Sequence, residues 1–226
     1  MPLRILVIAH PDDESMFFVP TIRAFQEAYP DDPFWILCLT KGDYDGLGRV
    51  RVKELEQVAK RVLRMDRLIQ LDELQDHPTQ EWSIPEASKL LHRILEALVP
   101  SGQQAVELIT FDHGGVSGHI NHRDTYLAVR PLEYPVYTLS TETNPLRKYL
   151  PVLDWFLCLW TWFQSSPRTT TLETTRHGSI VCRCHEPSLV WKAMQTHASQ
   201  FVWYRRLFVV FSVYSYRNVL KPSSSH

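Results

Sequence analysis

Two clusters of histidine and aspartate combine side chains that bind metal ions with side chains that transfer protons. Each cluster directly follows an apolar, β-branched run of the type that forms a buried parallel strand. The clusters consist of His10, Asp12 and Asp13 after residues 4–8, and of His119 and His122 after residues 106–111. Imidazole and carboxylate groups are the usual ligands of a catalytic zinc ion, which takes three of them and leaves a fourth position open.

Three of these side chains, His10, Asp13 and His122, supply such a ligand set. Asp12 would then lie beside the metal, where its carboxylate can accept a proton from water. His119 would lie on the opposite side, where it can donate a proton to a leaving group. Hydrolysis of an unactivated amide requires this combination of acid, base and metal. The two clusters therefore predict a zinc-dependent amidase.

Each residue also has a simpler interpretation when it is taken alone. Asp12 would serve as a helix N-cap, since aspartate is common at that position. His119 would be a hydrogen-bonded loop histidine, and Gly114 and Gly115 would form an ordinary turn. The catalytic interpretation is favoured because both clusters follow predicted strands.

The first half of the chain alternates between strand and helix patterns, which predicts a parallel sheet with right-handed crossovers. The expected strands are 4–8, 34–40, 67–71 and 106–111, separated by helices over 15–28, 49–63 and from 82–85 to 98. The predicted fold class is α/β, a Rossmann-like three-layer sandwich with a mostly parallel sheet. If the first and fourth strands are neighbours, the clusters face each other at roughly 5 Å, across the crevice where such sheets bind ligands. No glycine-rich dinucleotide fingerprint follows the first strand, which argues against a nicotinamide or flavin cofactor.

The second half is less regular, and we treat residues 1–226 as one domain with an aromatic-rich insertion and loop over 144–178. The expected elements there are a strand at 136–140, an exposed threonine-rich loop at 167–176, a strand at 179–183, a helix at 187–197 and a late strand at 208–216. Within the insertion, residues 150–163 are apolar almost all round if helical. That segment is too short to span a bilayer, so it is either a buried helix or an interfacial one that docks the catalytic rim on a membrane.

Composition excludes several classes of protein. The net charge of −1 gives no electrostatic reason to expect a nucleic acid partner. Four cysteines without metal-type spacing fit a reducing compartment better than a disulfide framework. No apolar stretch reaches the roughly 20 residues of a membrane-spanning helix.

Several motifs together resemble one family of hydrolases. AHPDDE at residues 9–14 and GHINH at 118–122 are typical of the zinc-dependent LmbE-like de-N-acetylases. Further stretches at 48–55, 146–154 and 197–207 are similar to the branch of that family that acts in GPI-anchor synthesis, the N-acetylglucosaminylphosphatidylinositol de-N-acetylases. The likeness covers nearly the whole chain.

The resemblance implies a zinc ion and hydrolysis of an N-acetyl group from a glycolipid headgroup, at the cytoplasmic face of the endoplasmic reticulum membrane. It places the zinc ligands at His10, Asp13 and His122, the base at Asp12, and the acid or oxyanion helper at His119. By the same resemblance Arg51 would bind a polar or phosphate part of the substrate, the alternative being a solvated arginine near a helix start. Asp112 is the expected carboxylate partner of His119, and His197 lies in a family stretch without an assigned role. Members of this branch usually begin with a membrane-spanning helix, which is missing here. Peripheral membrane contact through residues 150–163 is expected because the implied substrate keeps its lipid tail in the bilayer.

Two other functions stay open at this stage. One is a deacetylase of a soluble N-acetyl amino sugar, against which the apolar segment 150–163 argues. The other is a non-catalytic scaffold subunit with the same fold, against which the complete set of ligands and proton-transfer residues argues. A metal assay on the purified protein separates the scaffold from both enzymes.

Overall fold

The computed structural model describes residues 2–99, 105–163 and 170–223. Its centre is one sheet in which the described strands follow the order β3-β2-β1-β4-β5-β8-β7-β6. The strands paired in parallel are β1 (Leu3–Ile8), β2 (Phe34–Cys38), β3 (Arg67–Gln70), β4 (Val106–Phe111) and β5 (Val136–Leu139). The strands that extend the sheet in antiparallel pairing are β8 (Arg217–Pro222), β7 (Ile180–Cys184) and β6 (Thr170–Thr174). This arrangement confirms the predicted α/β fold with a mostly parallel sheet.

Strand β1 is the central element of the parallel part. Every one of its residues is buried, and it pairs with β2 on one side and β4 on the other. Fully burying an aliphatic side chain stabilises a fold by about 1.5–3 kcal/mol, so a strand that is apolar except for Arg4, which is paired with Asp32 and Glu107, belongs in the middle of a sheet. Because β1 and β4 are neighbours, the two catalytic clusters leave the sheet side by side, as predicted.

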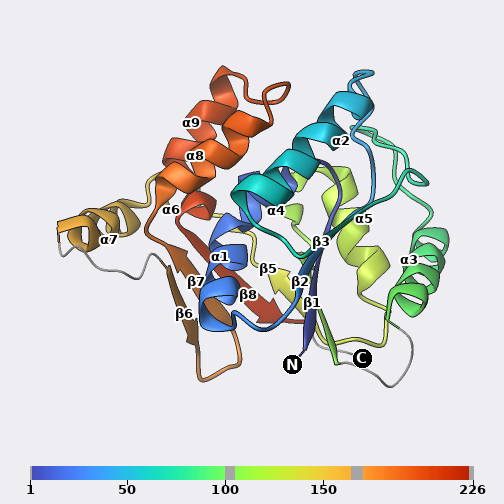
Figure 1. Ribbon diagram of the computed structural model, residues 1–226, viewed down its shortest axis with the longest axis horizontal. Helices are drawn as coiled ribbons and strands as arrows, with labels where there is room; N and C mark the ends of the chain where they lie inside the picture. Colours follow the sequence, from blue (N-terminus) through green and yellow to red (C-terminus); the bar gives the residue numbers. More distant parts are fainter. Residues whose placement is uncertain (1, 100–104, 164–169, 224–226) are drawn as a thin grey trace.

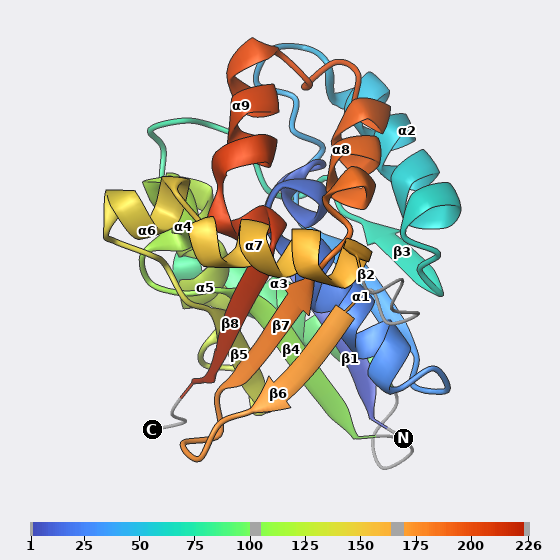
Figure 2. The ribbon, with the colours of Figure 1, turned by 90° about the vertical axis from the view of Figure 1, so that its left-hand side faces the viewer.

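Helices cover both faces of the sheet (Figure 1). On one face α3 (Ile84–Leu98) packs against α5 (Ile120–Val129), and α5 contacts β4 and β1. On the other face α1 (Val19–Ala28) lies over β6, β7 and β8. Near the carboxyl ends of the parallel strands, α8 (Pro187–Thr196) and α9 (Trp203–Phe211) stand next to each other (Figure 2).

Two of the predicted helices contain a π-helical turn. The helix expected at 15–28 begins as η1 (Glu14–Phe18) and continues as α1. The helix expected at 49–63 is α2 (Gly48–Gln57) followed by η2 (Val58–Val62). Single π turns are frequent at functional sites, and η1 directly follows the first catalytic cluster.

The late strand predicted at 208–216 is wrong. Residues 203–211 form α9, Val213–Ser215 form a 3-10 turn, and the strand comes afterwards as β8. A short apolar run with two valines fits a helix as well as a strand, so its periodicity does not decide between them. In the fold only Val209 of α9 is buried, and β8 fills the place between β5 and β7.

Residues 167–169 of the predicted exposed loop at 167–176 lie outside the described part of the structure. For the described residues the prediction of a loop is wrong. Thr170–Thr174 form β6, which pairs with β7 over its whole length. Threonine is β-branched and suits an extended strand, and the neighbouring strand supplies the hydrogen-bond partners that the sequence alone does not reveal.

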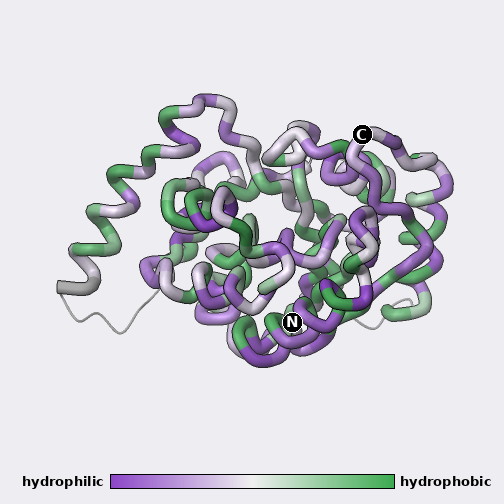
Figure 3. Tube along the Cα trace, turned by 90° about the horizontal axis from the view of Figure 1, so that it is seen from above, coloured by the Kyte–Doolittle hydropathy of each residue, from purple (hydrophilic) through white to green (hydrophobic). Residues whose placement is uncertain are grey.

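The aromatic-rich insertion forms two helices, α6 (Pro145–Tyr149) and α7 (Val152–Phe163). Helix α7 projects from the body and carries many hydrophobic residues (Figures 1 and 3). The residues of α7 that are more than half exposed are Val152, Leu153, Phe156, Leu159 and Trp160. Complete burial of this segment is therefore excluded. Within the described ranges, no helix combines the length and apolar character needed to cross a bilayer.

Candidate active site

The two predicted clusters meet in one pocket of about 210 Å³ at the carboxyl ends of β1 and β4. Asp76 and Arg205, which the sequence did not single out as catalytic, join them there. The lining residues are His10, Asp12, Asp13, Met16, Phe17, Arg51, Asp76, Ser117, His119, His122 and Arg205. All six residues predicted to act in the site are therefore brought together by the fold.

Three imidazoles of the pocket are close enough to share a metal ion. Nitrogen atoms of His10, His119 and His122 all lie within 4.8 Å of one another. The buried carboxylate of Asp13 lies among them, with Oδ1 3.0 Å from Nε2 of His122 and Oδ2 3.7 Å from Nδ1 of His10. Nitrogen and oxygen donors at this spacing suit a divalent transition metal.

The ring of His122 is oriented so that its Nε2 faces Asp13. Its Nδ1 lies 3.0 Å from the carbonyl oxygen of Gly115, the acceptor to which that nitrogen can donate, which leaves Nε2 facing Asp13. The ring also stacks on Phe111, with centroids 4.1 Å apart. A backbone carbonyl behind the imidazole is the usual way in which proteins orient a histidine ligand.

Asp76 pairs with His10 from the loop that follows β3. Its Oδ1 lies 3.1 Å from Nε2 of His10. Burial disfavours the protonated form of His10, but the hydrogen bonds and charges of Asp13 and Asp76 outweigh burial and raise its pKa to about 10. Asp76 lies five residues after Leu71, the last residue of the strand predicted at 67–71, and this position after a strand end is the signal in the sequence that could have pointed to it.

His119 caps the start of α5. Its Nδ1 accepts a hydrogen bond from the backbone N–H of Asn121 at 3.2 Å. Burial lowers the pKa of His119 to about 4, and the nearby charges of His10 and His122 lower it as well. His119 is therefore a neutral imidazole at pH 7.

The predicted pairing of Asp112 with His119 is wrong. Asp112 accepts hydrogen bonds from the backbone N–H of Gly114 at 2.9 Å and from the backbone N–H of Thr141 at 2.6 Å. Its Oδ1 also accepts from the Thr141 hydroxyl. The Asp112 carboxylate thus connects the carboxyl end of β4 to the segment that follows β5 through hydrogen bonds.

Asp12 has a strained backbone and a carboxylate that is paired through one oxygen, Oδ2. Its φ of 126° lies in a region that residues other than glycine rarely adopt, and such strain is concentrated at functional sites. Its backbone N–H donates to Glu14 at 3.2 Å, and its carboxylate forms ion pairs with Arg205 and, at 3.4 Å, with Arg51. The N-cap interpretation of Asp12 is therefore wrong.

Arg51 is buried, so the alternative of a solvated surface arginine is also wrong. Its guanidinium donates to the carbonyl oxygens of Gly42 at 2.9 Å and Pro11 at 3.0 Å, and lies 3.7 Å from Asp76. A side chain on Gly42 would place its Cβ 2.5 Å from the guanidinium carbon, so the close approach requires glycine. Arg51 thereby connects the loop after β2 to Asp12 and Asp76.

His197 supports the first cluster from a distant part of the chain. Its Nε2 lies 2.6 Å from Oε1 of Glu14, and both side chains are fully buried. Glu14 in turn accepts from the Ser15 hydroxyl and from the backbone N–H of Asp12. His197 therefore acts on the site through Glu14.

A family model described as PIG-L, GlcNAc-PI de-N-acetylase, matches residues 5–132, more than half of the chain and both catalytic clusters. The chain belongs to this family. Among curated PIG-L relatives, the N-acetylglucosaminyl-phosphatidylinositol de-N-acetylase of Bos taurus is 36% identical over 96% of this chain and 81% of the bovine protein. The enzyme of the same name from Saccharomyces cerevisiae is 32% identical over 94% of this chain and 79% of the yeast protein.

Solved structures support the fold of this PIG-L chain. The N,N'-diacetylchitobiose deacetylase of Pyrococcus horikoshii aligns with a TM-score of 0.60 and 18% identity, over 97% of this chain and 83% of that protein. The zinc inhibited form of teicoplanin deacetylase Orf2 aligns with a TM-score of 0.53 and 15% identity, over 99% of this chain and all of that one. The fold of this chain is thus that of known deacetylases.

Proposed function

We propose that this protein hydrolyses the N-acetyl group of N-acetylglucosaminylphosphatidylinositol, giving glucosaminylphosphatidylinositol and acetate as an early step of GPI-anchor synthesis. The observation that carries the proposal is the meeting of His10, Asp12, Asp13, His119 and His122 in one pocket. The relatives named for this reaction support the choice of substrate.

In the proposed site, His10, Asp13 and His122 would hold a zinc ion. Their donors are two imidazoles and one carboxylate, the set that catalytic zinc ions take, and His122 is already oriented by Gly115. When bound, zinc would supply Lewis-acid polarisation of the amide carbonyl.

Proton transfer is assigned to Asp12. Its carboxylate lines the catalytic pocket and forms ion pairs with Arg51 and Arg205, and a carboxylate in this place can accept the proton of the attacking water. The C–N bond of the amide breaks when this proton is passed to the departing nitrogen, which leaves as the amine of glucosamine while the acetyl carbon becomes acetate. A single carboxylate thus serves first as base and then as acid.

His119 is assigned the role of hydrogen-bond donor to the amide oxygen. Because its Nδ1 accepts from the N–H of Asn121, Nε2 carries the hydrogen of the neutral ring. A donor aimed at an oxygen on which negative charge develops is worth about 10²–10³ in rate. Arg51 lines the same pocket and is assigned to the polar edge of the sugar.

Helix α7 is assigned to peripheral contact with the membrane that carries the lipid substrate. Its exposed residues include Phe156 and Trp160, whose rings stack with centroids 6.3 Å apart. Trp155 of α7 packs against Phe211 of α9, with ring centroids 6.0 Å apart. Helix α9 also contributes Phe208 and Phe211 to a cavity next to the catalytic pocket, so this contact connects α7 to that cavity. Tryptophan is favoured in the headgroup layer of a bilayer. The family's place in GPI-anchor synthesis makes the cytoplasmic face of the endoplasmic reticulum the proposed location.

Release of acetate from N-acetylglucosaminylphosphatidylinositol and from free N-acetylglucosamine, each with and without a chelator, tests this function. We expect release from the glycolipid that stops with the chelator and returns with zinc. Release from the free sugar at an equal kcat/KM would assign the enzyme to soluble amino sugars. A purified protein that holds no metal and releases no acetate from either compound would be the scaffold.

A further inference from the structure

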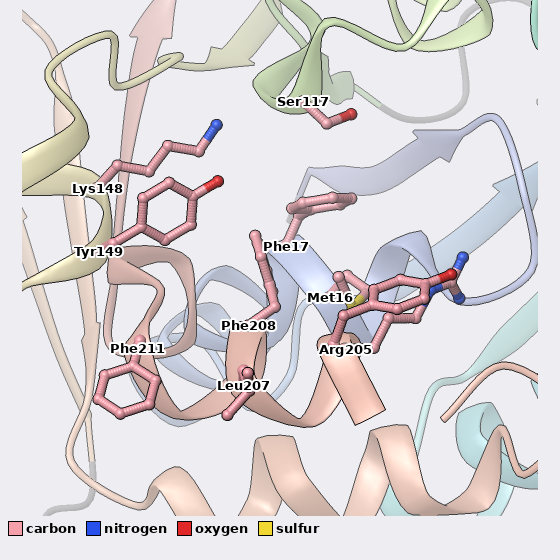
Figure 4. Close-up of a pocket in the computed structure, with 10 residues that line it drawn as sticks. Met16, Phe17, Ser117, Lys148, Tyr149, Arg205, Leu207, Phe208 and Phe211 are labelled. Carbon is pink, nitrogen blue, oxygen red and sulfur yellow. The ribbon is translucent and has the colours of Figure 1, made fainter. Parts of the chain in front are cut away.

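A second, larger cavity adjoins the catalytic pocket, and Figure 4 shows residues that line it. Its volume is about 570 Å³, and we call it the outer cavity. Its lining residues are Met16, Phe17, Ser117, Lys148, Tyr149, Tyr204, Arg205, Leu207, Phe208 and Phe211. Four of them, Met16, Phe17, Ser117 and Arg205, also line the catalytic pocket. The two spaces therefore share part of their walls, and a substrate that reached from one into the other would pass these four side chains.

Most of the outer cavity wall is apolar, and its one lysine comes from α6. Leu207, Phe208 and Phe211 of α9 form one side, and Lys148 and Tyr149 of α6 form the other (Figure 4). The ammonium group of Lys148 points from α6 towards the segment of Ser117, and the hydroxyl of Tyr149 points towards Phe17 (Figure 4).

Lys148 has donor capacity to spare. Its half-buried Nζ donates to the carbonyl oxygen of Val116 at 2.7 Å, and among the described residues it forms no ion pair. An ammonium group carries three hydrogens, so one carbonyl does not use them all. Burial lowers the pKa of Lys148, with the charge of Glu142 opposing it. A partly desolvated cation of this kind gains from an anionic ligand.

The cations of the catalytic pocket differ from Lys148 because they are already paired with carboxylates. Arg51 is compensated by Asp12 and Asp76, and Arg205 is compensated by Asp12. Asp13 adds a further carboxylate among the histidines. A phosphate placed in the catalytic pocket would therefore meet several carboxylates, whereas a phosphate in the outer cavity would meet Lys148.

We propose that the outer cavity binds the phosphodiester of an anionic glycolipid, with Lys148 contacting the phosphate and the α9 wall contacting the first carbons of the acyl chains. The proposal rests on the proposed function, and it specifies which part of the substrate lies in which cavity. The sugar amide occupies the catalytic pocket, and the lipid leaves the protein along α9, on the side of α7.

Binding of soluble ligands tests the proposal without catalysis. The probes are dihexanoylphosphatidylinositol, inositol 1-phosphate and dihexanoylglycerol, and the variants are Lys148→Gln, Lys148→Arg and the matched control Lys192→Gln on the exposed side of α8. We expect Lys148→Gln to raise the Kd of the phospholipid about 10- to 150-fold, the change that corresponds to the loss of one hydrogen bond to a charged group. Lys148→Arg should retain most of the affinity, and the control should retain all of it. An unchanged Kd in Lys148→Gln would overturn the proposal.

The other two probes test the two halves of the site separately. We expect inositol 1-phosphate and dihexanoylglycerol each to bind more weakly than the phospholipid. Phe211→Ala, which shortens an exposed side chain, should weaken binding of the phospholipid but leave the affinity for inositol 1-phosphate unchanged. Equal affinities for inositol 1-phosphate and the phospholipid would overturn the lipid part of the assignment and leave a site for free phosphate compounds.

Kinetics separate this proposal from the proposed function. In acetate release from dihexanoyl N-acetylglucosaminylphosphatidylinositol, Lys148→Gln should raise KM with a smaller effect on kcat. A structural role of the bond between Lys148 and Val116 would instead lower the melting temperature and kcat together, which would overturn the proposal. Absence of acetate release by the wild-type protein would reject the proposed function, while the binding experiments would still decide whether the outer cavity holds the phosphodiester.

Discussion

Glu14 and His197 form a fully buried pair 2.6 Å apart, although 183 positions separate them in the sequence. Glu14 is the last residue of the AHPDDE motif, and it lines neither cavity described above. Its second carboxylate oxygen accepts the backbone N–H of Asp12. The pair therefore holds the strained backbone of the proposed base, and His197 is a positioning residue.

This pair makes stability depend on pH. Burial disfavours the charged form of His197, but the charge and hydrogen bond of Glu14 outweigh burial and raise its pKa above the ordinary value of 6.5. A histidine with a raised pKa contributes stability that is fully present below the unfolded-state pKa and is lost as the pH rises through the folded-state pKa. We therefore expect the stability advantage of wild type over His197→Gln to be largest below pH 6.5 and to shrink above it.

Urea unfolding in chelator over a pH series measures that advantage. Removing one partner of a buried pair costs about 3–5 kcal/mol, so the difference at low pH is within reach of the method. Parallel stability curves for the two proteins at all pH values would contradict the assignment. His92→Gln on the exposed side of α3 is the matched control.

His122→Ala should remove most of the bound metal, because the two remaining ligands make a poor zinc site. Metal content of the purified protein, measured by mass spectrometry, checks this expectation. The exposed His113, nine residues away, supplies the control variant His113→Ala, which should keep its metal. Full metal content and activity in His122→Ala would show that the ligand assignment is wrong.

The Asp12→Asn variant should retain the metal but hydrolyse the substrate much more slowly than the wild type. The amide has the shape of the carboxylate but cannot accept a proton, and a general base contributes about 10²–10⁴ in rate. Acetate release and metal content are measured together, with Asp31→Asn, an exposed aspartate, as control. Loss of metal in Asp12→Asn would instead indicate that Asp12 and Asp13 have exchanged roles.

His119→Ala should keep the metal and lower kcat about 10²–10³-fold, as expected for the loss of one donor to the developing oxyanion. The result is informative because His119 also lies within 4.8 Å of the other two imidazoles. If His119→Ala loses the metal and Asp13→Ala keeps it, the ligand set consists of the three histidines. An unchanged kcat would exclude His119 from the reaction.

Phe156→Glu combined with Trp160→Glu should abolish binding to phosphatidylinositol vesicles and leave folding and metal content intact. Both side chains are more than half exposed on α7, so the introduced glutamates are solvated in the free protein and do not disturb the fold. In the membrane-bound protein they would lie at the bilayer interface, where a negative charge opposes burial of the apolar face. Trp162, a further tryptophan of this segment, has a side chain outside the described part of the structure. Leu127→Glu, a partly exposed apolar position on α5, is the control and should bind vesicles normally. Unfolding of the double variant would reassign α7 to the core.

The sequence by itself determined the parallel half of the sheet and the two catalytic clusters. Apolar runs such as 4–8 and 106–111 carry a local pattern that is typical of buried strands, and the polar residues after them mark one edge of the sheet. The adjacency of β1 and β4 followed from a general rule of strand order, without any contact being known. Residues within a few positions of one another were sufficient for each of these predictions.

Only the tertiary structure decided the places of Asp76, Arg205 and His197. Each comes from a segment whose own pattern says nothing about its partner, and each finds that partner 66, 193 or 183 positions away, at His10, Asp12 and Glu14 respectively. The tertiary structure also decided β6, which forms by pairing with β7, and the end of α9. The short run 208–211 suits a helix or a strand equally, and the outcome depends on which neighbouring elements offer hydrogen bonds and burial. Such pairings are set by the packing of the whole chain, because the free energy of a buried ion pair or a paired strand exists only once both partners are in place.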